Sequence, residues 1–454
     1  MVRGGGLLKK ILITGAFLSV GALAWAGATQ FSSSAFEKKL VEIQTNPDLP
    51  SYLELTVLTS EKGFLQSTGT MRWNVSASAM AGLEEIDLPN KIGGLIHFTM
   101  HHSPSPAGLS RFDAEIVADG WLGEMTKRVT FSDILLTVTG QAGFNQQWVS
   151  EFKTPKVSWD SDGLNLRIPV TTGTVMTAGH GAIRYNWEMA RAAAASTDGN
   201  LVISGVSAHG SIQDSQLGTG SGQFSIASLK TKDVGAIGIE FAAETTEVAG
   251  KIDTVVTYKL EQLNASGRQF KDLALGFALR GLDVGNVRVI QQTLRDLNAD
   301  MQRISSDQAL SLENAAASLL DKGLSIALTD ARGKSDQGEF FGQLQLQLKP
   351  APVQTPFLNR IAASGNARVS QSLLPGPMGQ VAMSTGYVSD NGGNYSTSLE
   401  LANGQLSVNG NQVDAAITDQ LALMMQVLDM QLIAWRDGLT RGESMIGGML
   451  PVRN

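Results

Sequence analysis

Three histidines lie close together in the sequence and are the first candidates for metal-binding chemistry. His97 precedes His101 by four residues, and His102 follows directly. On a helix, residues 97 and 101 would share one face, as zinc-binding histidines often do. The surrounding segment, IHFTMHHSPSP, is typical of a strand and a turn, and no carboxylate lies close to it in sequence. We therefore expect no metal site at these histidines.

Two glycine-containing segments resemble catalytic or phosphate-binding motifs. Gly205 and Ser207 begin a nucleophile-elbow pattern, but His209 stands where the second glycine belongs, so we expect a strand end there. The segment GTGSG at 218–222 lacks the Lys-Ser/Thr pair of a phosphate-binding loop and opens no expected helix. We interpret it as an ordinary loop.

Asp160 and Asp162 could be taken for a catalytic or calcium-binding pair, but Gly163 and a strand follow directly, which favours a turn. The chain contains no cysteine, and this excludes disulfides, thiol catalysis and cysteine-ligated metals. The sequons at Asn74, Asn264 and Asn394 carry little meaning in a bacterial envelope protein. The sequence thus predicts a protein that is not an enzyme, with no catalytic, cofactor-binding or metal site.

The composition favours strands and turns over helical bundles. Only 17% of the 454 residues are charged, and 49 are glycine. The formal charge is −7, and without Arg3, Lys9 and Lys10 the remainder carries −10. A mildly acidic chain with no basic stripe argues against nucleic acid as a partner.

The first apolar run, residues 11–28, determines where the rest of the chain is expected to lie. This run contains no charged residue and follows Arg3, Lys9 and Lys10. Its 18 residues would form roughly 27 Å of helix, close to the ~30 Å hydrocarbon core of a bilayer. Cations before such a run stay in the cytoplasm, so the body is expected outside it. A cleaved signal peptide is the alternative, because small residues flank Trp25, but we favour a retained anchor.

Alternating segments then predict a long succession of strands. A short amphipathic stalk helix is expected at 31–46, and strands are expected from 52–58 onward. A short helix is expected at 188–195, because four consecutive alanines follow Arg191. The clearest strand is 342–349, where Leu344, Leu346 and Leu348 alternate with glutamines. This pattern predicts one buried and one wet face.

Helical periodicity interrupts the strands twice. Apolar residues at spacings of three and four predict a helix from 287 to 304 and a second one from 310 to 320. A last helix, 413–439, has Asp414 as its cap and one apolar stripe, which we expect to dock on the protein's own sheet. The stripe comprises Ile417, Leu421, Met424, Leu428, Leu432, Trp435 and Leu439.

These elements define the expected fold class: mainly β with accessory helices. An N-terminal transmembrane helix would be followed by an extended, curved antiparallel sheet with a helical insert and a C-terminal helix. The expected divisions are an anchor or uncleaved signal at 1–30, the stalk at 31–46, a β-rich periplasmic region at 47–286, the helical insert at 287–322, a second β-rich region at 323–412, and the C-terminal helix and tail at 413–454.

Four features, in this order, resemble the YdgA family of bacterial inner-membrane proteins of unknown function. They are the N-terminal anchor with its helix, the segment EKGFLQS at 61–67, the helix pair leading into 325–328 and 342–349, and LANGQLSVNG at 401–410. The resemblance implies an inner-membrane anchor and a periplasmic β-rich body. It implies no catalytic residues.

The predicted function is accordingly non-catalytic: a single-pass inner-membrane protein whose periplasmic sheet holds lipid or another hydrophobic ligand on its apolar face. One alternative is an envelope scaffold that contacts other proteins, and another is a hydrolase whose site has no recognisable motif. An apolar groove along the sheet would favour lipid, and a packed interior with a flat exposed patch would favour protein partners.

Overall fold

The structure is a computed structural model. It describes residues 53–442 apart from 64–65, 77–90, 102–109, 131, 143–146, 162–163, 178–181, 197–198, 215–216, 301–304, 352–354 and 375. Among the described residues, no helix is both long and apolar enough to cross a membrane. The anchor and stalk expected before residue 47 lie outside this range.

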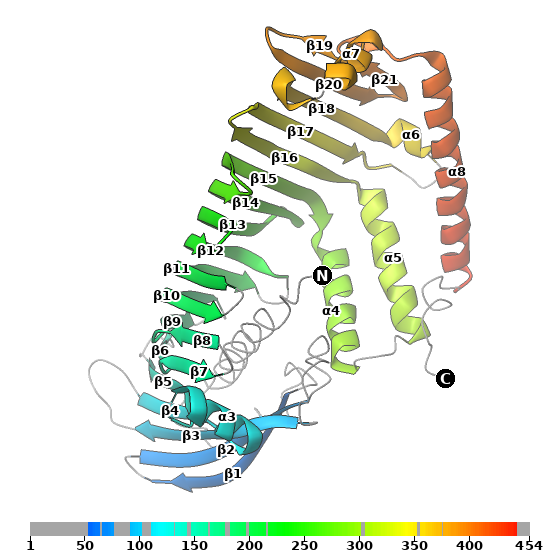
Figure 1. Ribbon diagram of the computed structural model, residues 1–454. Helices are drawn as coiled ribbons and strands as arrows, with labels where there is room; N and C mark the ends of the chain where they lie inside the picture. The colour runs from blue at the N-terminus through cyan, green and yellow to red at the C-terminus, as the bar shows by residue number, and fades with distance from the viewer. Residues whose placement is uncertain are drawn as a thin grey trace. The chain divides into compact units, whose positions relative to one another are not determined.

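The fold is mainly β, as the alternating segments predict, and its 22 strands are assigned to one sheet in which every pair described below is antiparallel (Figure 1). The chain divides into two compact units. Unit 1 extends to Gln213 and includes Ile226–Lys232, and unit 2 comprises Asp214–Ser225 and the chain from Asp233 onward. Strand β12 (Thr219–Lys230) contributes residues to both units.

Unit 1 contains eleven strands and one helix in its described part. Its elements are β1 (Leu53–Lys62), β2 (Gln66–Ser76), β3 (Lys91–His101), β4 (Ser110–Ala118), α3 (Gly120–Thr130), β5 (Ile134–Ala142), β6 (Trp148–Lys153), β7 (Val157–Ser161), β8 (Leu164–Ile168), β9 (Thr172–Thr177), β10 (Ile183–Ser196) and β11 (Gly199–Asp214). Strands β1 to β6 pair in chain order, then β6 pairs with β9 and β9 with β10. The β7–β8 hairpin pairs with the end of β10, and β11 pairs along the other side of β10.

Unit 1 has a packed hydrophobic core. Trp73 on β2 and Leu122 on α3 are almost completely buried. The rings of Phe112 and Trp148 stack with centroids 4.9 Å apart. Gly140 lies opposite Phe112 in register, and the ring occupies the space that a side chain at Gly140 would need. The apolar face of these strands is therefore covered, as in an ordinary globular core.

Unit 2 is a meander of strands interrupted by helices. Its strands are β13 (Val234–Val248), β14 (Lys251–Ala265), β15 (Arg268–Asp283), β16 (Leu324–Ser335), β17 (Gly338–Leu348), β18 (Ile361–Ser370), β19 (Ser389–Asp390), β20 (Asn394–Ala402), β21 (Gln405–Val408) and β22 (Asn411–Gln412). Strands β13 to β18 pair in chain order, β18 pairs with β20, and β20 pairs with β19 and β21. Strand β22 pairs with β21.

The helices of unit 2 are α4 (Val284–Asp300), α5 (Ser306–Lys322), α6 (Phe357–Arg360), α7 (Gly376–Ser384) and α8 (Ala415–Thr440), with a 3-10 turn at Gln371–Leu373. Helices α4 and α5 form the connection from β15 to β16 along the chain, and they pack on one another (Figure 1). A capping box at Ser305 and Gln308 begins α5. The periodicity at 287–320 therefore predicted a real helix pair.

Two elements differ from the sequence-based expectation. The helix predicted at 188–195 is wrong, because this segment lies in strand β10. It pairs with β11 along one side, and its residues 193–195 pair with β8 on the other. Two ladders of hydrogen bonds outweigh the modest helix preference of four alanines. Helix α3 lies in a region that was expected to contain only strands.

Candidate functional site

The histidines singled out in the sequence are not arranged as metal ligands. His97 and His101 lie on the same face of β3, four residues and hence about 13 Å apart along the strand. His101 Nε2 lies 3.2 Å from Asp113 Oδ2, and His97 Nδ1 lies 3.1 Å from the hydroxyl of Thr70. No group of three histidine, aspartate or glutamate side chains in the described residues could hold a metal ion. His102 lies outside the described residues.

The motif-like segments also have ordinary structural settings. Ser207 lies within β11, opposite Glu188 on β10, and the strand continues to Asp214. The strand-to-helix turn of a nucleophile elbow is therefore missing at this serine. The loop expected at 218–222 is wrong for most of that segment, because residues 219–222 already belong to strand β12. Gly218, just before the strand, has a positive φ of 65°.

Asp160 belongs to the β7–β8 hairpin. Asp160 Oδ2 accepts a hydrogen bond of 3.0 Å from the Asn165 side chain across the β7–β8 pair. Asp162 lies outside the described residues. The sequons at Asn74, Asn264 and Asn394 lie in β2, β14 and β20.

The most unusual surface of unit 2 is one apolar face of its sheet. Register places Leu344 opposite Leu328, Leu328 opposite Phe277, and Phe277 opposite Val256. A second row, one pleat along, aligns Leu346 with Ile326 and Ile326 with Leu279. Because side chains alternate along each strand, these residues all project from the same face, across β14 to β17.

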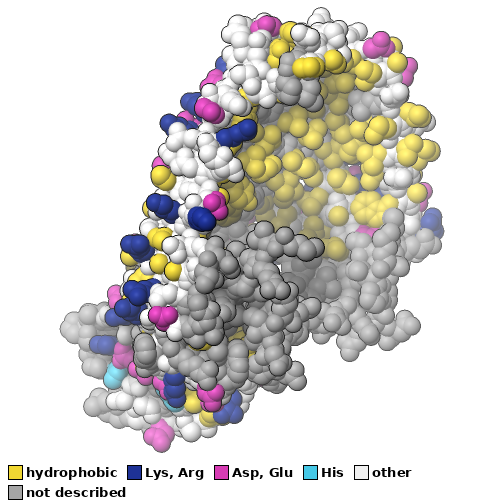
Figure 2. All heavy atoms as spheres, in the orientation of Figure 1, with side chains coloured by type: hydrophobic (Ala, Val, Ile, Leu, Met, Phe, Trp, Pro, Cys, Tyr) yellow, Lys and Arg dark blue, Asp and Glu magenta, His cyan; other side chains and the backbone are white. Residues whose placement is uncertain are grey.

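This face is exposed, whereas the sequence predicted it buried. Leu344 is 41% exposed, Leu346 43%, Phe277 43% and Ile326 50%, and only Leu348 at the strand end is buried, at 7%. We call the exposed set the exposed apolar face; it comprises Tyr258, Leu275, Phe277, Ile326, Leu344 and Leu346. Figure 2 shows hydrophobic side chains gathered in a hollow over the strands of unit 2. A monomer seldom leaves so large an apolar surface in water without a function for it.

Helix α8 adds further exposed apolar side chains. Asp414 caps its start through a 2.8 Å bond from the Ala416 N–H, as the sequence predicted. Its outward side chains form what we call the outer strip of α8, namely Leu423, Val427, Met430 and Ile433, all exposed. In Figure 2 hydrophobic side chains on α8 face the viewer in the same view as the hollow.

Helix α8 docks on helices rather than on the sheet that the sequence analysis expected. Its contacts are chiefly with α5 and α6. Of the predicted apolar stripe, Leu439 is buried, Leu428, Leu432 and Trp435 are half-buried, and Ile417 and Met424 are exposed. The prediction of one fully covered stripe is therefore wrong for the first half of the helix.

Polar contacts fix the second half of α8 to α5 and α6. Trp435 Nε1 donates to Glu313 Oε2 at 2.8 Å, and Glu313 is itself buried. The Arg436 guanidinium donates to both carboxylate oxygens of Asp321, at 2.6 and 2.8 Å, and to the Ala317 carbonyl at 2.9 Å. Asp429 accepts from the Phe357 N–H at 2.7 Å.

A second arginine lies beside this cluster. Arg360 is 4% exposed and donates to the carbonyls of Leu320 and Lys349. Burial lowers the pKa of Arg360 from its ordinary value, and the nearby Asp321 carboxylate opposes that shift. Arginine still keeps its charge. Because Leu320 lies at the C-terminal end of α5, the guanidinium also stabilises the negative end of that helix.

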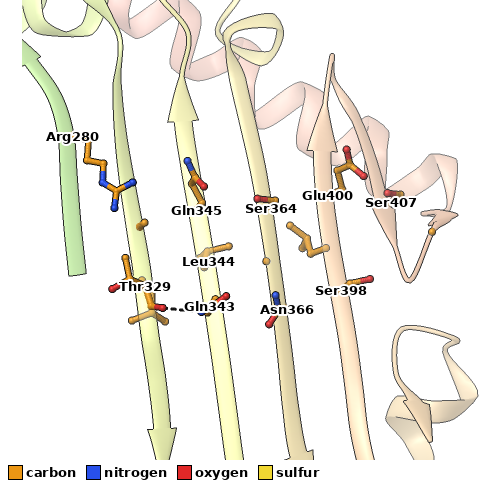
Figure 3. Close-up of a pocket in the computed structure, with 15 residues that line it drawn as sticks. Arg280, Thr329, Gln343, Leu344, Gln345, Ser364, Asn366, Ser398, Glu400 and Ser407 are labelled. Carbon is orange, nitrogen blue, oxygen red and sulfur yellow. Dashed lines mark hydrogen bonds between the residues drawn. The ribbon is translucent and has the colours of Figure 1, made fainter. Parts of the chain in front are cut away.

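The opposite face of the same strands carries a polar hollow of about 440 Å³ (Figure 3). Its polar lining consists of Gln343 and Gln345 on β17, Ser364 and Asn366 on β18, and Ser398 and Glu400 on β20, with Arg280 and Thr329 at one side. Leu328, Leu344 and Leu399 also border it. Gln343 Nε2 donates to the Thr329 carbonyl at 3.0 Å, and Gln345 Nε2 donates to the Ser325 hydroxyl at 3.3 Å. These two bonds fix the glutamine amides.

Comparison with known proteins identifies the family of the chain. Residues 8–416 match the family described as bacterial protein of unknown function (DUF945). The chain belongs to this family. No curated protein and no solved structure matches the chain. The DUF945 match spans both structural units, and its description assigns no activity to them.

Sequence reasoning identified the apolar alternation of β17 but missed the exposed apolar face and the outer strip of α8. The available signal was that α8 is apolar nearly all round, as in LALMMQVLDMQLIAW at 421–435, which exceeds what one docking stripe requires. A second signal was the alternation LALGFAL at 273–279, directly before the helix pair.

Proposed function

We propose that this DUF945 protein is a non-catalytic lipid-binding protein, which holds acyl chains on the exposed apolar face of unit 2. The observation that carries the proposal is the contrast between the two units. The strands of unit 1 bury Trp73 and Met100 in a packed core, whereas Leu346 and Ile326 of unit 2 remain about half exposed. Covering one such side chain fully is worth up to about 1.5–3 kcal/mol, so an occupant of this face would be bound chiefly by apolar contact.

The dimensions of the face fit an acyl chain. The in-register row from Val256 to Leu344 crosses four adjacent strands, which is about 14 Å at 4.8 Å per strand. One leaflet of a bilayer has a hydrocarbon thickness of about half of 30 Å. A lipid chain lying across the strands would therefore contact the whole row.

The chemistry of the face favours a hydrocarbon over an extended peptide. The backbone groups of β14 to β17 are paired with their neighbours on both sides. Apart from the Tyr258 hydroxyl, the side chains of the face have no hydrogen-bonding group. A peptide strand lying flat on this surface would bury amides without partners, and each such amide costs about 1–3 kcal/mol. An acyl chain has no such groups.

Lipid that co-purifies with the full-length protein provides the test. We expect native mass spectrometry after purification in mild detergent to show bound acyl lipid. Leu346→Asp should reduce it about tenfold or more, because the new carboxylate would have to lose water against hydrocarbon. The matched control is Gln345→Asp, on the same strand and the opposite face, which should leave the bound lipid unchanged.

Equal lipid content in Leu346→Asp and Gln345→Asp would contradict the proposal. A stoichiometric protein partner in place of lipid would instead support the scaffold alternative. Matching melting temperatures of the two variants would show that both are folded, and this is expected because both positions are exposed.

We also propose a single-pass inner-membrane location with the body in the periplasm. The support is the charge-free run at 11–28 preceded by Arg3, Lys9 and Lys10. The likeness to YdgA proteins, carried most specifically by LANGQLSVNG at 401–410, supports the same location. The 401–410 segment forms the hairpin β20–β21, with Asn403 and Asn409 at positive φ, as its two Asn-Gly pairs indicate.

A further inference from the structure

We propose that the polar hollow of unit 2 is a second binding site, for an oligosaccharide that carries an acidic group. Its polar side chains project from the face opposite the exposed apolar face, and the proposal does not depend on lipid binding. Its volume of about 440 Å³ falls within the ordinary range of small-ligand sites.

Strand register arranges the lining side chains in two rows. One row consists of Gln345, Ser364, Glu400 and Ser407, each directly opposite the next on neighbouring strands. The other consists of Gln343, Asn366 and Ser398. Figure 3 shows these side chains next to one another across β17, β18 and β20. Polar groups therefore recur about every 4.8 Å, which suits an extended ligand with repeated polar units.

Two charged side chains in the hollow have no ionic partner. Arg280 lies on β15 and Glu400 on β20, four strand spacings or about 19 Å apart. Neither forms an ion pair within the described part of the chain. By contrast, farther along the same polar face, Arg332 pairs with Asp330 at 3.3 Å, and Arg368 pairs with Glu339 at 2.9 Å. An unpaired guanidinium is a ready site for a carboxylate or phosphate.

The lining selects a sugar chain over other polar polymers. Amide and hydroxyl groups both donate and accept hydrogen bonds, as sugar hydroxyls do. The described residues that line the hollow include no aromatic side chain, so nucleic-acid bases would find no stacking surface among them. The flanking strands are paired on both sides at this point, so a peptide cannot add as a new strand.

Calorimetric titration of the full-length protein with defined hexasaccharides tests this proposal. The probes are a galacturonic acid hexamer, a glucose hexamer phosphorylated at one end, and the neutral glucose hexamer. We expect at least one acidic hexamer to bind more tightly than the neutral one. Arg280→Gln should weaken that binding about tenfold, since it removes a charge-assisted pair of hydrogen bonds.

Arg332→Gln is the matched control, because Arg332 lies on the same face outside the hollow. It should change the binding less than about twofold, since exposed charges beyond the contact are largely screened by salt. Leu346→Asp should leave saccharide binding intact, which separates this site from the lipid proposal. The proposal is overturned if no hexamer binds, if the neutral hexamer binds as well as the acidic ones, or if both arginine variants lose binding equally.

Discussion

At the scale of single residues, β17 presents neighbouring side chains to entirely different surroundings. Gln345 faces the polar hollow, Leu346 the exposed apolar face, and Leu348, two residues along, is buried. Leu348→Ala should therefore lower the free energy of unfolding by about 2–4 kcal/mol through cavity formation. Leu346→Ala should cost about 1 kcal/mol or less, because much of its side chain is already in water.

Chemical denaturation of these two variants and Gln345→Ala measures the difference. Gln345→Ala should remain within roughly 0.5 kcal/mol of the parent protein. If Leu346→Ala lowers the free energy of unfolding as much as Leu348→Ala does, another part of the chain covers the exposed apolar face in solution. The lipid proposal would then lose its basis.

The alternation in 342–349 allowed a correct assignment of which side chains share a face, because the period of two follows from strand geometry alone. It could not show whether the leucine face was covered. Burial depends on what the rest of the chain places opposite, and in the described part of the chain Leu344 and Leu346 remain 41% and 43% exposed. The polar hollow was equally hidden, since Arg280 and Glu400 are 120 positions apart in the sequence.

At the scale of elements, the Arg436–Asp321 pair is predicted to hold α8 in place. Arg436 is 13% exposed and donates three hydrogen bonds to α5. Arg436→Met should weaken docking by roughly 1–3 kcal/mol, since Asp321 and a helix-end carbonyl lose a charged donor. Hydrogen exchange of residues 415–440 should then become about tenfold faster or more.

The comparison variant is Arg332→Met, which removes a more exposed ion pair on β16. That loss should cost less than about 1 kcal/mol and leave exchange in α8 unchanged. Unchanged exchange in Arg436→Met would show that apolar contacts of Leu432 and Leu439 suffice, and that the polar cluster is dispensable for docking.

The ion pair between the start of α4 and the end of α5 should contribute an acid-sensitive share of stability. The Lys322 ammonium, 2.7 Å from Asp283 Oδ2, lowers the pKa of that carboxyl below its ordinary value of 3.8, and the Asn286 N–H acts in the same direction. Because the folded-state pKa is depressed, this stabilisation is fully present above about pH 4 and is lost as the pH falls further through the folded-state pKa.

Thermal unfolding followed between pH 7 and pH 2 tests the role of Asp283. Asp283→Asn should lower stability at neutral pH, and the difference from the parent protein should shrink below about pH 4. A difference that is constant over the whole range would show that the ion pair with Lys322 contributes nothing.

The presence of the helices was more predictable than their boundaries, because apolar spacing of three and four is a local signal. Asp414 correctly marked the start of α8, whereas α4 and α5 begin three and four residues before their predicted starts at 287 and 310. The segment at 188–195 was assigned wrongly because its alanines report only local preference. Its strand structure depends on partners on β11 that are 5 to 19 residues away, from Asn200 opposite Ala195 to Ser207 opposite Glu188, and local spacing does not reveal them.

At the scale of the whole molecule, the topology proposal predicts that the body lies outside the cytoplasm. The three cations before the apolar run favour a cytoplasmic N-terminus. Alkaline phosphatase fused after Asn454 should therefore be active in cells. A stably expressed but inactive fusion would contradict this topology, and recovery of a mature form beginning near Gly27 would indicate a cleaved signal instead.

The two faces of unit 2 assign different tasks to one sheet. Unit 1 has a packed hydrophobic core, while unit 2 leaves an apolar surface on one side of its sheet and a row of polar side chains on the other. We infer that ligand binding would stabilise unit 2 by mass action, so its unfolding should depend on bound lipid more strongly than that of unit 1.

Photo-crosslinking would show directly whether acyl chains lie on the exposed apolar face of unit 2. Full-length protein incubated with a fatty acid that carries a diazirine in its chain would be irradiated, digested and mapped by mass spectrometry. We expect the crosslinks to be concentrated in peptides of β15 to β17 and in the outer strip of α8. They should be lost in Leu346→Asp but not in Gln345→Asp. Crosslinks confined to other segments, or equally abundant in both variants, would contradict it.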